Sequence, residues 1–342
     1  MTILEKTIKN EKTGKVPVWF MRQAGRYLPE YQAIKKNRTF MEMVMDSEIA
    51  AEITLQPIKR FDLDAAIIFS DILVLLHALD MNVSFENGLP EISHVVNDEN
   101  DIDKLMNNYS AEKLEGRLEY YSKAIKIARS ELSNEKTLIG FAAAPFTLAS
   151  YMIEGKTSKT HAKTRAWMYS NANSFGKLMD FIVKSTIDYL TIQIKAGANV
   201  IQLFDSWGDA MATDAYLKHI VSYIEKISLE IGKKVPVIYF CRGASIHRQS
   251  LTPLYNKGVS VLSLDWRLPI DTYGNSPVQG NLDPAVLLSN PDTVRTMTSE
   301  ILEKRGHKTG YIFNLGHGIY PETPMENVEA MVETVKNFKP KY

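Results

Sequence analysis

Two arginines stand four residues apart in the pentapeptide Arg22-Gln23-Ala24-Gly25-Arg26, which directly follows an apolar run over 16–21. A guanidinium binds a carboxylate through two parallel N–H donors and stays charged at every physiological pH. Because the apolar run predicts a strand, the pentapeptide predicts a loop at a strand end that grips a ligand with several carboxylates. A pair of surface arginines in a turn is the alternative, and for an isolated pair at this spacing it is the usual explanation.

Composition narrows the class of protein. The chain has 342 residues, of which 45% are apolar and 23% charged, values typical of a globular protein. Lys plus Arg and Asp plus Glu both number 40, so net charge gives no case for a nucleic-acid or membrane partner. The single cysteine, Cys241, excludes an intramolecular disulfide and a Cys-rich zinc site. Residues 1–15 carry no apolar signal core. We expect a soluble, cytoplasmic protein.

Short apolar runs alternate with helical patterns along the chain. Most of the runs are continuously apolar, which is typical of strands buried on both faces of a parallel sheet. The expected strands are 16–21, 65–70, 137–142, 199–205, 235–241, 260–265, 278–282 and 310–315. Helices are expected from Ser47 onward and over 214–231, 284–305 and 325–338, and residues 137–153 are expected to hold a strand, a loop and a helix start. Residues 81–96 alternate in polarity around Asn87-Gly88 and predict a hairpin.

Eight strand–helix units predict a (β/α)8 TIM barrel, as one domain over residues 1–342 with a small antiparallel excursion after the second strand. A doubly wound open sheet is the alternative, and it would be expected to carry a glycine-rich nucleotide loop. Gly316-His317-Gly318 is followed by Pro321 and so lacks the third glycine. Residues 155–157 imitate the end of a P-loop, but Ser150 stands where its first glycine belongs.

Polar residues follow nearly every expected strand. In a barrel the carboxyl ends of the strands meet at one mouth, where active sites are built. The residues at these ends are Arg22 and Arg26; Ser70 and Asp71; Thr147 and Tyr151; Asp205, Ser206 and Trp207; Arg242 and Gly243; Asp265 and Trp266; Gly280, Asn281 and Asp283; and Gly316, His317 and Gly318. Any one of these sets is weak evidence, but together they predict a site.

Asp71 interrupts an otherwise apolar run and has two explanations of equal weight. It is either a helix N-cap at a strand–helix junction or a functional carboxylate in a pocket of low dielectric. His317 lies between two glycines, which let other groups approach the backbone closely. The seven histidines form no H-x-x-x-H or H-x-H pattern, so we expect no metal. The arginines indicate an anionic organic substrate instead.

The sequence resembles the uroporphyrinogen decarboxylase family over nearly its whole length. The most specific motif is PVWFMRQAGRYLPEY at 17–31. A second signature covers Gly140 to Pro145 with Thr147, Leu148, Tyr151 and Gly155, and AIIFSDIL (66–73), FDSW (204–207), QGNLD (279–283) and FNLGHGI (313–319) follow in order. The family usually has glycine where this chain has Ala143.

The resemblance implies a (β/α)8 barrel that works as a homodimer in heme synthesis, with uroporphyrinogen as substrate and no cofactor or metal. It implies substrate contacts at Arg22, Gln23, Ala24, Gly25, Arg26, Phe40, Asp71, Tyr151, Ser206 and His317, and catalytic roles for Asp71, Arg22, Tyr151 and His317. We expect Asp71 to accept pyrrole N–H bonds and stabilise a cationic ring, and Arg22 to hold the reacting acetate.

Two other functions share this scaffold. Corrinoid and thiol methyltransferases need a zinc-binding set of His and Cys, and a single cysteine argues against that function. A non-catalytic tetrapyrrole carrier is disfavoured, but not excluded, by the arginine–aspartate set.

Overall fold

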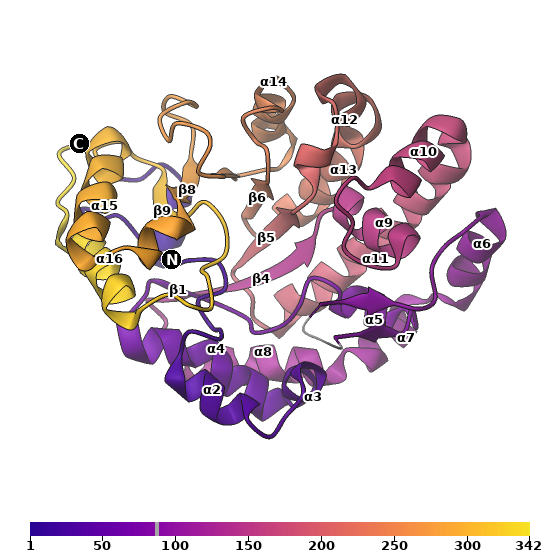
Figure 1. Ribbon diagram of the computed structural model, residues 1–342, viewed down its shortest axis with the longest axis horizontal. Coiled ribbons are helices and arrows are strands. Elements are labelled where there is room, and N and C mark those ends of the chain that lie inside the picture. The colour runs from indigo at the N-terminus through magenta and orange to yellow at the C-terminus, as the bar shows by residue number, and fades with distance from the viewer. Residues whose placement is uncertain (86–88) are drawn as a thin grey trace.

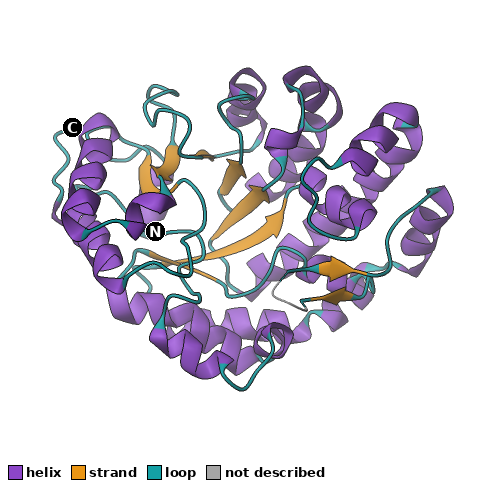
Figure 2. Cartoon of the chain, in the orientation of Figure 1, coloured by secondary structure: helices purple, strands orange, loops and turns teal. Residues whose placement is uncertain are grey.

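The computed structural model describes residues 1–85 and 89–342. Its main element is a parallel sheet whose strands lie in chain order, so each crossover places the next strand beside the last. The sheet is curled, and helices surround its outer side (Figures 1 and 2). The strands are β1 (Ala65–Ile67), β4 (Thr137–Ala143), β5 (Val200–Asp205), β6 (Val237–Cys241), β7 (Val261–Leu264), β8 (Val278–Leu282) and β9 (Tyr311–Leu315).

The helices that cover the sheet come mostly between the strands, with shorter ones at the strand ends. Their bounds are α1 (Ile3–Ile8), α2 (Pro29–Lys35), α3 (Phe40–Met45), α4 (Ser47–Phe61), α5 (Val74–Ala78), α6 (Glu99–Asn108), α7 (Ala111–Arg117), α8 (Glu119–Glu131), α9 (Pro145–Glu154), α10 (Ala162–Ser170), α11 (Ala172–Ala196), α12 (Thr213–His219), α13 (Val221–Gly232), α14 (Arg248–Leu251), α15 (Pro291–Arg305) and α16 (Met325–Asn337), with 3-10 turns η2 (Gly208–Ala210), η3 (Thr252–Lys257) and η4 (Pro284–Leu288). None of these helices is long and apolar enough to cross a membrane.

Two expected strands differ: β1 ends at Ile67 rather than at Ser70, and the first expected strand, 16–21, does not form. Only Val18 pairs, in an isolated parallel bridge to Phe313 of β9. Phe313 N donates to the Pro17 carbonyl (2.9 Å), and Asp64 N, just before β1, donates to the Val18 carbonyl (2.9 Å). Pro17 has no N–H to extend the ladder. The described residues therefore form a curled seven-stranded sheet rather than the closed eight-stranded barrel that we predicted, and segment 16–21 contacts both edge strands.

The expected helices are confirmed with two breaks. Ser47 begins α4, which the Asp46 side chain caps by accepting from two backbone N–H groups. The pattern over 214–231 splits at Ile220 into α12 and α13. The pattern over 284–305 splits into η4 and α15, because Asn290 caps a new helix and Pro291 occupies its first position.

The antiparallel excursion after β1 is confirmed as a two-stranded sheet. Strands β2 (Val83–Ser84) and β3 (Glu91–Ile92) pair antiparallel. The Asn87-Gly88 turn that predicted it lies outside the described residues. Ile92 N donates to the Gly155 carbonyl (2.6 Å), which ties this sheet to the end of α9.

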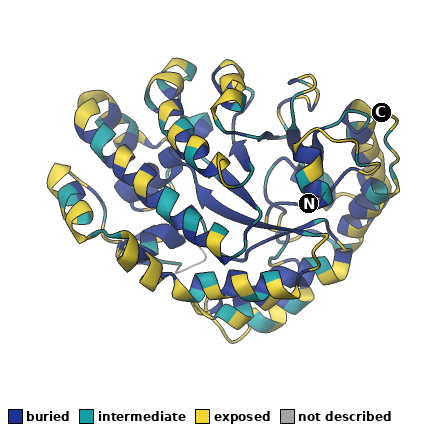
Figure 3. Ribbon diagram, turned by 180° about the vertical axis from the view of Figure 1, so that it is seen from behind, coloured by how far each residue is buried: buried dark blue, intermediate teal, exposed yellow. Residues whose placement is uncertain are grey.

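The sheet is buried on both faces (Figure 3), yet its centre contains a series of hydrogen-bonded polar side chains. Gln279 on β8 accepts from Trp19 Nε1 (2.9 Å) and donates to Gln202 Oε1 on β5 (3.0 Å) and Ser263 Oγ on β7 (2.9 Å). All four residues are buried. Because buried polar groups are costly unless paired, these hydrogen bonds fix segment 16–21 in register with the strands.

Candidate active site

Arg22 is held by the loop that follows β9. Its φ is +64°, in the left-handed region that costs a non-glycine residue free energy. Its side chain crosses the Cα atom of Gly318 so closely that a Cβ there would lie 2.5 Å from Arg22 Cδ. Ile319 N donates to the Met21 carbonyl (3.0 Å) and keeps the two loops side by side. The Arg22 stem is therefore fixed, and its guanidinium is exposed.

The remaining residues of the pentapeptide play unequal parts. Gln23 is fully buried: it accepts from Phe20 N (3.2 Å) and donates to the Ala65 carbonyl (3.0 Å), so its side chain faces the fold. A Cβ on Gly25 would lie 2.9 Å from the Arg22 carbonyl oxygen. Ala24 is partly buried and Arg26 is exposed. The two arginines therefore differ, because the loop after β9 braces Arg22.

Asp71 lies two residues before the N-cap of α5, so it does not cap that helix. Its Oδ1 accepts from Leu73 N (2.8 Å), while Oδ2 has no hydrogen bond among the described residues. Burial raises the pKa of the Asp71 carboxyl from 3.8 to about 6, although the Leu73 hydrogen bond and the Arg22 charge oppose the shift. Of the two explanations, a free, partly desolvated carboxylate near Arg22 fits this geometry better than a cap.

Tyr151 on α9 lies in the field of the same two groups. Burial raises the pKa of its phenol, the charge of Asp71 raises it further, and the charge of Arg22 lowers it. The hydroxyl therefore keeps its proton at neutral pH and acts as a neutral donor. Three of the four expected catalytic residues, Arg22, Asp71 and Tyr151, are thus brought together.

His317 is partly buried and remains neutral. Burial and the charges of Arg22, Arg242 and Arg267 lower the pKa of its imidazole to about 4. Its ring meets those of Phe240 (6.0 Å between centroids) and Trp266 (6.4 Å) edge to face. A Cβ on the preceding Gly316 would collide with Trp266 N. Gly316 thus leaves room for Trp266, and Gly318 leaves room for the Arg22 side chain. His317 lies between these two glycines in the sequence.

Ser206 is placed by a buried carboxylate. Asp205, at the end of β5, accepts from Thr147 Oγ1 (3.0 Å), Tyr216 Oη (2.8 Å) and Tyr239 Oη (2.9 Å). Thr147 Oγ1 also accepts from Ser206 N (3.0 Å). Since Thr147 stands one helical turn before Tyr151 on α9, this network fixes the positions of Ser206 and Tyr151 together.

Phe40 packs against the segment that carries Asp71. The Phe40 ring lies 5.6 Å from that of Phe69, two residues before Asp71, and 4.8 Å from that of Phe85. It is partly exposed. The expected contact residue is therefore an apolar neighbour of the carboxylate.

Two arginines that affect His317 were not among the expected substrate contacts, although Arg242 was among the residues expected at the strand ends. Arg242 follows β6 and Arg267 lies three residues after β7. Arg242 pairs with Asp209 (3.0 Å) and Arg267 with Asp265 (2.8 Å). The sequence signal for Arg267 was its place in Asp265-Trp266-Arg267, directly after an apolar strand. Asn281, which was expected at the end of β8, points into the fold instead: its side chain donates to the carbonyls of Asp265 and Leu268.

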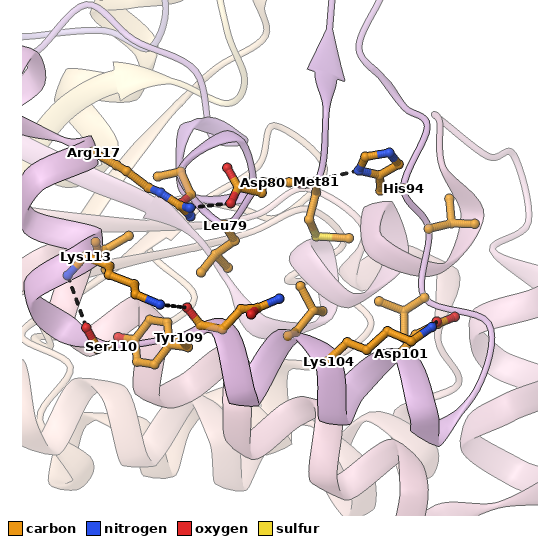
Figure 4. A pocket seen from close by; sticks show the side chains of 16 residues that line it. Leu79, Asp80, Met81, His94, Asp101, Lys104, Tyr109, Ser110, Lys113 and Arg117 are labelled. Atoms are coloured by element: carbon orange, nitrogen blue, oxygen red, sulfur yellow. Dashed lines mark hydrogen bonds and ion pairs between the residues drawn. The ribbon is translucent and has the colours of Figure 1, made fainter.

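A cavity of about 220 Å3 lies away from these strand ends, between α5, α6, α7 and the two-stranded sheet (Figure 4). Its cations have partners: Arg117 contacts Asp80, and Lys104 lies 2.9 Å from Asp101. It is smaller than the ~300 Å3 at which ligand pockets usually begin. Within residues 1–85 and 89–342, no three His, Cys, Asp or Glu side chains are grouped to hold a metal ion.

Replacing Thr147 with Val tests the network beneath the site. The change leaves Ser206 N unpaired and removes one donor from a buried carboxylate, so we expect the free energy of unfolding to fall by about 2–4 kcal/mol in chemical denaturation. Thr147→Ser keeps the hydroxyl and should lose at most about 1 kcal/mol. Equal losses in both variants would mean that the methyl group, not the hydroxyl, matters.

Comparisons with known proteins agree on one family. The model of the "Uroporphyrinogen decarboxylase (URO-D)" family matches residues 2–338. The chain is 41% identical over 346 residues to "Uroporphyrinogen decarboxylase" of Coxiella burnetii, covering 97% of this chain and 94% of that protein. It is 40% identical over 351 residues to the protein of the same name from Alkalilimnicola ehrlichii, covering 99% and 94%.

Among solved structures, a methyltransferase from Methanosarcina mazei superposes with a TM-score of 0.80 at 20% identity, covering 97% of both chains. A B12-independent methionine synthase from Shewanella sp. W3-18-1 gives a TM-score of 0.55 at 13% identity, covering 94% of this chain and 93% of that one. At such low identity these two indicate a shared fold and nothing about activity. The matches across nearly the whole sequence decide the family: the chain belongs to the uroporphyrinogen decarboxylase family.

Proposed function

We propose that this chain decarboxylates the four acetate side chains of uroporphyrinogen III to methyl groups, giving coproporphyrinogen III and four CO2 in heme biosynthesis, without a cofactor. Membership of the family supports this activity. The observation that assigns the activity to particular residues is the state of Asp71. Its carboxylate is partly desolvated, has one oxygen unpaired among the described residues, and is affected by the charge of Arg22.

Each decarboxylation needs an acceptor for the electron pair of the breaking C–C bond. Protonation of the pyrrole carbon next to the acetate-bearing carbon makes the ring that acceptor. CO2 then leaves, the exocyclic carbon takes a proton to become methyl, and the ring carbon loses its added proton. One proton is consumed for each CO2, and no oxidant or reductant is required. The protein has only to hold the macrocycle, stabilise the cationic ring and control protons.

Asp71 stabilises the cationic ring in this scheme. With a pKa of about 6, its carboxyl is largely ionised at pH 7–8. The unpaired oxygen accepts pyrrole N–H donors, and its negative charge lies where positive charge develops. A fixed charge in a partly dehydrated site stabilises such a transition state more than water does, because it needs no reorganisation.

Arg22 positions the reacting acetate. A guanidinium does not give up its proton readily in proteins and is poorly matched to direct proton donation, so we assign Arg22 carboxylate binding beside protons relayed through water. Tyr151, Ser206 and His317 supply neutral donors to carboxylates, and Arg26 supplies a second guanidinium. Phe40 and Ala24 line the apolar side of the macrocycle, while Gln23 and Gly25 shape the loop that presents Arg22.

We also propose, as for the family, a homodimer in the cytoplasm, with segment 16–21 in the place that an eighth strand would take between β9 and β1. A methyltransferase and a passive tetrapyrrole carrier are the competing functions. Incubation with uroporphyrinogen, followed by CO2 measurement and chromatography of the products, separates all three, because only a decarboxylase yields CO2 and methylated rings. Sedimentation of the same preparation tests the dimer.

Replacing Asp71 with Asn keeps the shape and the acceptor for Leu73 N but removes the charge. We expect CO2 release to fall about 10²–10³-fold. We also expect the variant to unfold at an equal or higher temperature at pH 8, because it no longer buries a charge. Since the pKa of Asp71 is raised in the fold, its ionisation destabilises the native state as pH rises from about 4 through 6, so the variant's advantage should grow over that window. Near-normal turnover would remove Asp71 from the mechanism.

The same pKa predicts the acid limb of the pH profile. Protonation of Asp71 should lower kcat/KM as the pH falls through about 6. His317, with a pKa of about 4, should contribute no change between pH 5 and 8. The residual activity of Asp71→Asn should therefore lack the limb near pH 6. Profiles of the same shape in both proteins would assign that limb to the substrate.

Gly318→Ala tests the brace on Arg22. The added methyl would lie 2.5 Å from Arg22 Cδ and should displace the guanidinium, so we expect kcat/KM to fall about 10²-fold. The melting temperature should change little, because the flexible end of a side chain can move. Gly116→Ala on α7, where a Cβ meets no atom within 4 Å, is the matched control and should keep full activity. Wild-type kinetics for Gly318→Ala would show that the contact does not position Arg22.

A further inference from the structure

Two arginines beside the site share an arrangement that the proposed mechanism leaves unused. The Arg242 Cζ atom lies 5.8 Å from the centroid of the Trp207 ring, and Arg242 Nε lies 3.0 Å from Asp209 Oδ2. Arg267 lies over the ring of Trp266 (4.4 Å) and pairs with Asp265 (2.8 Å). An aromatic face and a carboxylate together restrict the orientation of a guanidinium, which is how arginine is prepared to bind an anion.

The loops that carry these arginines are joined to each other. Strands β6 and β7 pair side by side up to Cys241 and Leu264. One oxygen of Asp265, Oδ2, accepts from Gly243 N (2.8 Å) and from Arg267 Nη1 (2.8 Å). Because Asp265 is fully buried, it fixes the turn after Arg242 relative to Arg267.

Both arginines lie near the same histidine that Arg22 affects. The ring of Trp266, on which Arg267 stacks, lies 6.4 Å from that of His317, and Phe240, two residues before Arg242, lies 6.0 Å from it. The charges of Arg242, Arg267 and Arg22 all act on the His317 imidazole. The two arginines therefore border the same mouth as the pentapeptide but come from different strands.

The ion pairs leave most of the guanidinium donors free. Arg267 uses Nη1 for Asp265, and Arg242 contacts Asp209 through Nε. Among the described residues, no hydrogen bond is made by Arg267 Nη2 or by the Arg242 guanidinium, whose Nε contact with Asp209 is an ion pair without hydrogen-bond geometry. The two side chains are 40% and 32% exposed, so a ligand can reach them. If the two arginines served only to neutralise Asp209 and Asp265, their N–H donors would not need to be accessible to a ligand.

We propose that Arg242 and Arg267 form a second carboxylate-binding subsite, which holds side-chain carboxylates of the substrate remote from the ring under reaction. The subsite rests on the proposed function only for the identity of its ligand, a polycarboxylic tetrapyrrole. It acts on binding and orientation rather than on bond breaking. Loss of either arginine should therefore raise KM and leave kcat nearly unchanged.

The variants must not leave the buried Asp265 without its cation. We would compare Arg242→Gln with the double variant Asp265→Asn/Arg267→Gln, which removes both members of the second pair. Asp265→Asn alone keeps the arginine and reports the cost of the network itself. Arg267→Lys keeps the charge but not the planar fork. Arg248→Gln, an exposed arginine on α14 that contacts the Thr272 carbonyl (3.1 Å), is the matched control.

Equilibrium binding of uroporphyrin, the oxidised porphyrin with eight carboxylates, is measured by fluorescence, and KM and kcat are measured with uroporphyrinogen. We expect Kd and KM to rise about tenfold in Arg242→Gln and in the double variant, with kcat within about twofold, and Arg248→Gln to match the wild type. Arg267→Lys should recover only part of the affinity.

Unchanged Kd and KM in both variants would overturn the subsite, as would an equal loss in Asp265→Asn alone. If the double variant fails to fold by circular dichroism, Arg242→Gln decides the question. Failure of the proposed function looks different: a wild-type protein that binds the porphyrin and releases no CO2 from uroporphyrinogen would refute the activity while the binding comparison still tests the subsite.

Discussion

The Arg22 side chain lies across the Cα atom of Gly318, and this contact determines where the cationic side of the site stands. It joins the loop after β9 to the loop after segment 16–21, at the place where the two edges of the curled sheet approach each other. The Val18–Phe313 bridge and the Gln23 bond to the Ala65 carbonyl fix the same loop from either side. Arg22 can therefore hold a left-handed backbone that an unsupported loop would relax.

Burial sets the charge states around this guanidinium. It raises the pKa of Asp71 and lowers that of His317, so neutral pH finds a carboxylate, a neutral imidazole and a neutral phenol, Tyr151, near one fixed cation. Such a set can bind acid groups on one side and ring N–H groups on the other. The free-energy cost of the buried Asp71 charge is offset by the rest of the fold, which is expected where a site is built for function rather than stability.

Most of the strands and helices were predictable from the sequence. Continuous apolar runs identified β4 to β9 within two residues at each end, because strands buried on both faces must be apolar throughout. Pro17 explains part of the main error: a periodicity argument counts it as apolar, but it has no N–H to donate. The N–H groups of Val18 and Met21 donate to the side chains of Asp64 and Asn314 instead of a strand, so segment 16–21 keeps one isolated bridge. The expected helix over 284–305 took no account of Asn290-Pro291, which caps and begins a new helix.

The site was less predictable than the strands. Sequence identified Arg22, Asp71, Tyr151 and His317 as candidates, and the fold brings them together. It could not show that Gln23 faces inward, because a polar side chain in a motif looks the same whether it binds a ligand or two backbone groups. Nor could it distinguish Arg242 from a surface arginine, since its partners Trp207 and Asp209 are distant in the chain. Arg267 directly follows its partners Asp265 and Trp266, but adjacency in sequence does not show that they contact one another.

The most direct test of the account is the titration of the Asp71 carboxyl itself, by carboxyl-carbon NMR or infrared difference spectra assigned with Asp71→Asn. The account predicts a pKa near 6 in the wild type. It predicts a further rise when Arg22 is replaced by Gln, because the guanidinium charge, together with the Leu73 hydrogen bond, opposes the effect of burial. A pKa at the ordinary value of 3.8, unchanged by the loss of Arg22, would contradict the claim that these two groups form one site.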